Sequence, residues 1–202
     1  DLIAVTDHNS CRNAGAVMEA ARMLGLPLRV LPGMEVTTAE EVHVVCLFPE
    51  LAAAQAAGEE VEAALLPVKN KPEIFGHQWI LGPGEERLGE LETLLINATG
   101  LSIDEMPGFA KKYGGVAFPA HIDRTSNSVF ANLGYFPDHL DFSFAEVWQP
   151  EVFFQDSAHR NIRERYAILK NSDAHYLEKM KEGEPEETFG TLEAFLGRLF
   201  SV

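Results

Sequence analysis

The stretch Leu2-Ile3-Ala4-Val5-Thr6-Asp7-His8-Asn9 joins a short apolar run to polar residues of the kind that bind metals. Short runs of this composition predict β-strands. The same order, a strand followed by a polar residue, recurs in the ranges 28–35, 42–48, 115–121, 144–151 and 167–175. A βα barrel gathers its active-site residues in this way, at the carboxyl ends of its strands.

Helical patterns separate several of these strands. The first covers residues 13–24, with apolar side chains at helical spacing and Gly25 at its end. A second begins at Ser102, where Glu105 completes a capping box, and residues 156–165 form a third. Strands that alternate with helices predict an α/β fold with a mostly parallel sheet.

Two segments interrupt this alternation. Residues 67–86 are rich in Pro and Gly and predict an excursion or lid within a single domain that spans residues 1–202. Residues 176–188 carry a charged run, which predicts a solvated loop. With 202 residues and a hydrophobic content of 46%, the chain is long enough for one sizeable core, and nothing in it requires two.

The charge balance argues against one class of partner. The chain has 16 basic and 31 acidic residues, a formal net charge of −15, which repels a long polyanion unless bound cations reverse the local field. We therefore expect no extended duplex nucleic acid as a partner, whereas a small phosphate ester held by metals is compatible with this charge. No apolar run approaches membrane-spanning length, so we expect no membrane partner, and the oligomeric state stays open.

The cysteines indicate the redox compartment of the protein, and the first residue indicates whether a segment precedes it. Cys11 and Cys46 are too few for a disulfide framework and lack CxxC spacing, which favours a reducing compartment and a cytoplasmic location. The chain begins with Asp1 rather than methionine, and the residues after it have the pattern of a strand already under way. We therefore expect the natural protein to contain a segment upstream of this residue.

Histidine and carboxylate side chains stand near the strands in a combination that predicts a metal site. These ligands suit zinc, manganese and iron, and a carboxylate can bridge two cations. Two cations held close together activate a water and neutralise charge on a phosphoryl group. The candidate ligands are His8, Glu35, His43, His121, Asp173 and His175.

Each of these motifs has a structural alternative when it is taken alone. Asp7-His8 and His121 are compatible with ordinary turns, and a histidine in an alternating strand, such as His43, is more often a satisfied interior residue. Asp173-Ala174-His175 is the most specific motif, because alternate strand residues point the same way and direct both side chains at one site. The joint occurrence of the motifs at successive strands favours the metal site.

Five of these motifs together resemble the polymerase and histidinol phosphatase (PHP) superfamily. They are Val5-Thr6-Asp7-His8-Asn9-Ser10, Gly33-Met34-Glu35, His43-Val44-Val45-Cys46-Leu47-Phe48, Pro119-Ala120-His121-Ile122-Asp123-Arg124 and Asn171-Ser172-Asp173-Ala174-His175, in the order of the family. The resemblance implies an irregular seven-stranded βα barrel of the TIM-like kind and phosphoesterase activity. It also implies a cluster of two or three divalent metal ions, commonly zinc, manganese or iron.

The resemblance further implies a role for each ligand. Glu35 is expected to bridge two metals, and His43 and His121 to complete the coordination of one of them. Asp173 is expected to bind the second bridged metal.

The remaining candidate ligands are assigned to a third metal. One motif of the family is missing from the start of the chain. The resemblance places His8 and His175 on a third metal, and gives Asp7 the role of orienting a histidine rather than binding metal directly. The family pattern opens with a strand carrying His-x-His, and no such pair precedes Asp7. We therefore expect this chain to lack the first strand and helix of the barrel, and to bind fewer metals than a longer form.

The ligand set leads to a functional hypothesis with two alternatives. The leading one is a hydrolase that cleaves a phosphomonoester or short phosphodiester by in-line attack of a metal-bound hydroxide. The first alternative is a metal-binding regulatory or structural domain without turnover, and the six intact ligands count against it. The second is a 3'-5' exonuclease acting on short oligonucleotides, against which the acidic composition counts modestly.

Two arginines are candidate ligands for the substrate phosphate. Arg124 lies three positions beyond His121, and Arg12 follows the Asp7-His8 turn, so both are placed for forked hydrogen bonds to phosphate. For Arg12 a solvated helix face is the alternative. Cys11, His77, His139 and His159 are expected to lie outside the catalytic set.

Overall fold

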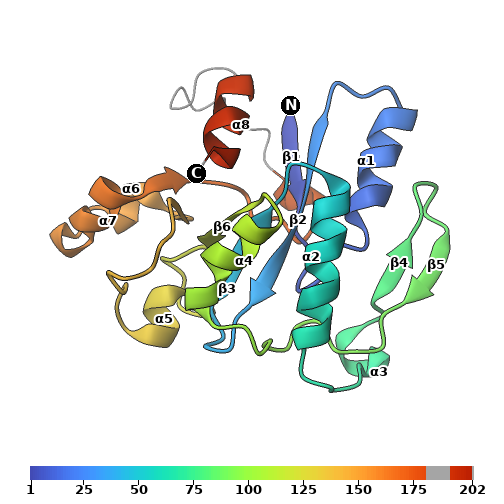
Figure 1. Ribbon diagram of the computed structural model, residues 1–202, viewed down its shortest axis with the longest axis horizontal. Helices are drawn as coiled ribbons and strands as arrows, with labels where there is room; N and C mark the ends of the chain where they lie inside the picture. Colours follow the sequence, from blue (N-terminus) through green and yellow to red (C-terminus); the bar gives the residue numbers. More distant parts are fainter. Residues whose placement is uncertain (181–191, 202) are drawn as a thin grey trace.

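Strands and helices alternate along the part of the chain that the computed structural model describes, residues 1–180 and 192–201 (Figure 1). In chain order the strands are β1 (Leu2–Val5), β2 (Arg29–Thr37), β3 (His43–Leu47), β4 (Trp79–Leu81), β5 (Arg87–Glu90), β6 (Val116–Pro119), β7 (Phe144–Glu146) and β8 (Ala167–Leu169). The α-helices are α1 (Ala14–Met23), α2 (Leu51–Ala64), α3 (Pro72–Phe75), α4 (Met106–Lys112), α5 (Val129–Leu133), α6 (Pro150–Phe153), α7 (Arg160–Arg165) and α8 (Leu192–Phe200). Short 3₁₀ turns are η1 (Ile103–Glu105), η2 (Ser157–His159) and η3 (Leu177–Lys179).

The local predictions for helices are confirmed. Helix α1 lies within the predicted range 13–24, and α7 with η2 fills most of 156–165. The capping box is present before η1 and α4, where Glu105 accepts hydrogen bonds from the backbone and hydroxyl of Ser102. Of the predicted loop 176–188, residues 176–180 are exposed, and the rest lies outside the described residues.

The prediction of a mostly parallel sheet is wrong. Among the described residues, four strands pair in the order β1-β2-β3-β6, and β3 runs antiparallel to both of its neighbours. Residues 38–42, which join β2 to β3, are too few for the crossover that a parallel pair requires. Parallel pairing is found between β1 and β2 and between β7 and β8. The fold is mixed α/β; these pairings form no closed barrel over the described ranges, and the seven-stranded barrel stays a prediction.

The central sheet separates two groups of buried apolar side chains. On one face, Met34 and Cys46 pack with side chains of α2 and α4 such as Val61 and Met106. On the other face, Leu31, Val45 and Leu47 pack with Leu199 of α8. Figure 1 shows α2 and α4 lying together over the sheet, with α8 apart from them. Because side chains alternate along a strand, this division decides which face each polar residue of β2 and β3 reaches.

The predicted excursion 67–86 contains α3 and β4, and it ends just before β5, which pairs antiparallel with β4. It lies at the edge of the molecule, beyond α1 and α2 (Figure 1). The side chain of Asn13 ties it to the rest, donating to the carbonyl of Trp79 and accepting from the backbone N–H of Leu81. Both the lid and the single domain spanning 1–202 stay predictions.

No helix in the described ranges has the length and the apolar character needed to cross a bilayer.

Candidate metal centre

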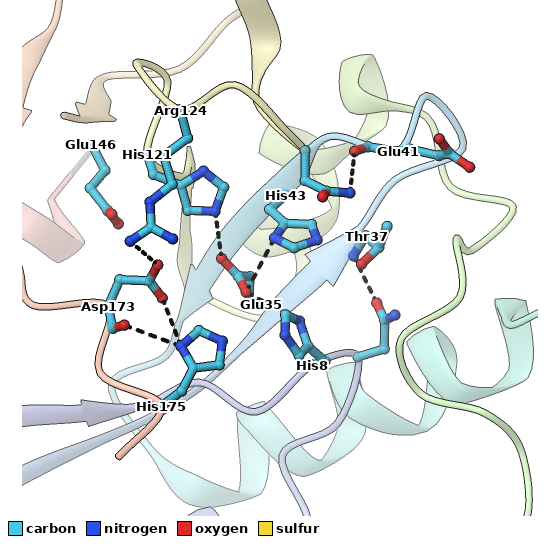
Figure 2. Close-up of polar contacts among 12 residues, drawn as sticks. His8, Glu35, Thr37, Glu41, His43, His121, Arg124, Glu146, Asp173 and His175 are labelled. Atoms are coloured by element: carbon cyan, nitrogen blue, oxygen red, sulfur yellow. Dashed lines mark hydrogen bonds and ion pairs between the residues drawn. The ribbon is translucent and has the colours of Figure 1, made fainter. Parts of the chain in front are cut away.

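The six predicted ligands converge on one small polar cleft of about 120 Å³ (Figure 2). They come from segments far apart in sequence: the turn after β1, the strands β2 and β3, the end of β6 and the loop after β8. The cleft is lined by His8, Glu35, His43, His121, Arg124, Ser126, Asn127, Asp173 and His175. The residues that sequence analysis singled out as ligands are therefore neighbours in space.

Strand register explains why Glu35 and His43 meet. In the antiparallel pair, Glu35 lies opposite Val45 and Thr37 lies opposite His43. Side chains two residues apart share a face, so Glu35 and His43 project on the side of Val45. Gly33 permits the close approach of these strands, because a Cβ atom there would lie 2.5 Å from the carbonyl oxygen of Cys46.

The turn after β1 brings His8 to the same place. Residues 8 and 35 form an isolated parallel bridge, in which the backbone N–H of Asn9 donates to the carbonyl of Glu35. The N–H of Glu35 in turn donates to the carbonyl of Asp7. Asn9 has a φ of 49°, a left-handed conformation that asparagine tolerates better than most residues. The Asp7-His8 motif is therefore a turn held against β2.

Glu35 lies at the centre of the histidines. Its Oε2 atom is 3.2 Å from Nδ1 of His8 and 3.4 Å from Nδ1 of His43, and its Oε1 atom is 3.4 Å from Nε2 of His121. Burial works to raise the pKa of Glu35, but the contacts with His121 and His43 outweigh it and hold that pKa well below its usual value. The carboxylate is therefore ionised and presents its two oxygens to different histidines.

The environment of these side chains fits a divalent cation. In the described part of the chain, the buried Nδ1 atom of His121 has no hydrogen-bond partner, and the buried Nδ1 atoms of His8 and His43 contact Oε2 of Glu35 without making a hydrogen bond to it. Buried polar atoms without a partner are costly unless something binds them. His8, Glu35 and His43 also offer ligand atoms that all lie within 4.8 Å of one another. Nitrogen and carboxylate donors at this spacing suit zinc, manganese or iron.

Asp173 and His175 form the second side of the cleft with Arg124. Oδ2 of Asp173 is 2.9 Å from a terminal nitrogen of Arg124, and its Oδ1 is 3.7 Å from Nδ1 of His175. The ring of His175 lies 5.9 Å from that of His8, centroid to centroid. Figure 2 shows Asp173 between Arg124 and His175, on the side of the cleft opposite His43. Its carboxylate thus stands between a guanidinium and an imidazole.

Comparison with known proteins agrees with this arrangement at the level of the fold. The sequence matches no protein-family profile and no curated protein. In structure, the chain resembles a lesion-specific endonuclease from Pyrococcus furiosus, with a TM-score of 0.62 and 15% identity over 100% of this chain and 48% of the endonuclease. It also resembles a candidate metal-dependent phosphoesterase from Bifidobacterium adolescentis, with a TM-score of 0.56 and 18% identity over 96% of this chain and 83% of that protein. Both likenesses show that this chain shares the fold of these proteins. The chain spans about half the length of the endonuclease.

Two residues predicted for the PHP-type site have other partners. Arg12 makes a bidentate pair with Glu62, at 2.9 and 2.7 Å, and is absent from the cleft lining given by the described residues. The carboxylate of Asp7 accepts a hydrogen bond of 3.3 Å from the side chain of Asn13, and burial raises its pKa. The orienting role of Asp7 stays a prediction, as does the binding of phosphate by Arg12, whose guanidinium is engaged elsewhere.

The remaining candidates lie outside the cleft, as expected. His77 pairs with Glu90 and stacks on Trp79, His139 pairs with Asp104, and the ring of His159 stacks on Phe153. The thiol of Cys11 is buried and donates to the carbonyl of Ala54, and burial raises its pKa to about 11. It is therefore held protonated and poorly suited to act as a nucleophile.

Sequence reasoning missed two polar residues that support the site. Asn9 is fully buried and makes side-chain hydrogen bonds to three backbone groups. Glu146 is a buried carboxylate at the end of β7. The available signal was an acidic residue within the apolar run Phe144-Ala145-Glu146-Val147-Trp148, where an ionisable side chain is unusual unless it has a partner.

Proposed function

We propose that this chain hydrolyses a phosphomonoester or short phosphodiester with the aid of two or three divalent cations, zinc, manganese or iron. The observation that carries the proposal is the convergence of four histidines and two carboxylates in one cleft, where the carboxylate of Glu35 contacts three of the histidines. The likeness in fold to a lesion-specific endonuclease and to a candidate metal-dependent phosphoesterase supports it. Cations bound there would lower the pKa of a water molecule and neutralise charge on the phosphoryl group.

The geometry supports cation binding by candidate ligands from two sides of the cleft. Glu35 presents one oxygen towards His121 and the other towards His43 and His8, a grouping that differs from the predicted pairing of His43 with His121 on one metal. Asp173 and His175 supply ligands from the opposite side. These side chains would hold the cations, and the substrate phosphate would enter from the mouth of the cleft.

Arg124 is suited to hold the phosphate. One terminal nitrogen reaches Asp173, its Nε atom is buried without a hydrogen-bond partner within the described residues, and the guanidinium lies 5.0 Å from the ring centroid of Trp148. A cation that takes the Asp173 carboxylate would leave the guanidinium free to make charge-assisted hydrogen bonds to phosphate oxygens. Ser126 and Asn127 add polar groups beside it.

A substrate panel tests the proposal. The chain is stripped with a chelator, reloaded with Mn²⁺ or Zn²⁺, and assayed with a nucleoside monophosphate, a sugar phosphate, a short single-stranded oligonucleotide and duplex DNA. We expect release of phosphate or nucleotide from the small substrates that disappears with chelator and returns with metal. Metal binding without turnover on any substrate would favour the regulatory domain. Cleavage confined to oligonucleotide ends would favour the exonuclease.

The two arginines give a matched pair of variants. We expect Arg124→Ala to raise the KM for a phosphate ester by about 10- to 100-fold, the loss of about 1.5–3 kcal/mol expected for charge-assisted hydrogen bonds. Arg12→Ala should leave KM near the wild-type value, because Arg12 is occupied by Glu62. Steady-state kinetics on both variants make the measurement. Equal effects of the two substitutions would contradict the placement of the phosphate beside Arg124.

A further inference from the structure

Glu146 is a buried carboxylate that the proposed mechanism does not use. It ends β7, is only 2% exposed, and burial raises its pKa. An ionisable group in such a place needs a partner, and its Oε2 atom accepts a hydrogen bond of 2.7 Å from Nδ2 of Asn171. Asn171 itself is exposed and lies in the loop that follows β8. The pair therefore connects the end of one strand to the loop after its neighbour.

The other end of the Asn171 amide reaches Asp173. Oδ1 of Asn171 accepts a hydrogen bond of 2.8 Å from the backbone N–H of Asp173. An amide nitrogen can only donate and an amide oxygen can only accept, so Glu146 fixes the orientation in which Asn171 can receive that N–H. Asp173 has a φ of 42°, a left-handed conformation that costs a non-glycine residue free energy even though aspartate adopts it more often than most.

The end of β7 also makes hydrogen bonds to the loop that follows β6. The N–H of Ile122 donates to the carbonyl of Glu146, and the carboxylate of Asp123 accepts from the N–H groups of Trp148 and Gln149. These contacts fix the segment that carries His121 and Arg124. Because Arg124 forms an ion pair with Asp173, the segments that follow β6, β7 and β8 are joined beside the cleft by hydrogen bonds and this ion pair.

We propose that Glu146 and Asn171 are positioning residues, which hold Asp173 in its left-handed conformation so that its carboxylate faces the metal-binding histidines. The inference rests on the proposed function in so far as Asp173 is a metal ligand. In this arrangement Glu146 acts on Asp173 through the side chain of Asn171, and Asn171 acts through the backbone N–H of Asp173. Partners of this kind orient a ligand before the metal arrives and are worth about 10- to 100-fold in metal affinity.

The test measures metal affinity directly, by equilibrium dialysis with Mn²⁺, together with thermal unfolding of the metal-free protein. We expect Asn171→Ala, a change at an exposed side chain, to weaken Mn²⁺ binding by about 10- to 100-fold while the protein stays folded. Glu146→Ala should have a similar effect, and the double variant should be no weaker than either single one, since both residues act in one chain. Glu146→Gln retains an acceptor for Asn171 and should restore most of the affinity.

Asn70→Ala is the matched control. Asn70 is buried and its side chain donates to the carbonyl of Gly76, outside the cleft, so its loss should leave the Mn²⁺ affinity unchanged. Wild-type affinity in Asn171→Ala, or effects of the two single variants that multiply in the double variant, would overturn the inference. A wild-type chain that binds no Mn²⁺ would overturn both proposals. The expected pattern of affinities without hydrolysis of any phosphoester would overturn the proposed function alone.

Discussion

Glu35→Gln is expected to lower metal-dependent kcat/KM for a phosphate ester by at least about 1,000-fold, which corresponds to about 4 kcal/mol of lost transition-state stabilisation. Glutamine keeps the shape of the side chain, but it is neutral and offers only one oxygen. The carboxylate of Glu35 faces three histidines through both of its oxygens. The variant should therefore bind fewer cations as well as turn over more slowly.

Glu62→Gln is the control for this prediction. Glu62 is also a partly buried, paired carboxylate, but it contacts Arg12 and Ser10 outside the cleft. Activity and metal content, measured by elemental analysis after gel filtration, should be near wild type in this variant. If Glu35→Gln kept wild-type metal content and turnover within about tenfold, Glu35 would not be the shared ligand.

Asn9→Ala is expected to lower the free energy of unfolding by about 2–4 kcal/mol, because several buried backbone groups lose their partner together. The side-chain nitrogen of Asn9 donates to the carbonyls of Leu95 and Asn97, at 2.7 and 2.9 Å, and its oxygen accepts from the N–H of Thr37 at 2.8 Å. Alanine satisfies none of these groups and is also less suited to the positive φ. Urea unfolding of the metal-free protein makes the measurement.

Asn132→Ala provides a comparison with a single exposed contact. Asn132 lies on the surface and donates one hydrogen bond to the carbonyl of Glu40, so its loss should change stability by less than about 0.5 kcal/mol. Equal stability of the two variants would show that the hydrogen bonds of Asn9 are replaced by water. Because His8 immediately precedes Asn9, the Asn9 variant should also bind metal more weakly.

The parts of the fold that depend on residues close together in the sequence were predictable. Helix α1 and the capping box at Ser102 follow from local spacing, and the structure has both. The direction of β3 was not recovered, because alternating strands and helices elsewhere suggested a mostly parallel sheet. The decisive fact was the short connection 38–42, which turns the chain back on itself. Pairing direction depends on the length of connections as well as on the strands.

The convergence of the candidate ligands on one cleft was predictable for a similar reason. Each follows or lies in a strand, and residues at strand ends meet when the strands pair. Arg12 and Arg124 could not be separated in this way, since each stands close to a candidate histidine. What distinguishes them is Glu62, which lies 50 residues from Arg12 in sequence and takes up its guanidinium. Glu146 was missed because its partner, Asn171, is likewise brought to it only by the pairing of β7 with β8.

The spread of the candidate ligands along the chain, from His8 to His175, links cation binding to the completion of folding. A segment that contains only β1 to β3 holds one side of the cleft, and the opposite side exists only once β7 and β8 have paired. An early intermediate would therefore bind cations weakly, and a cation at 100 times its Kd would favour the finished native state by about 2.7 kcal/mol. Metal uptake followed during refolding would thus report the pairing of β7 with β8.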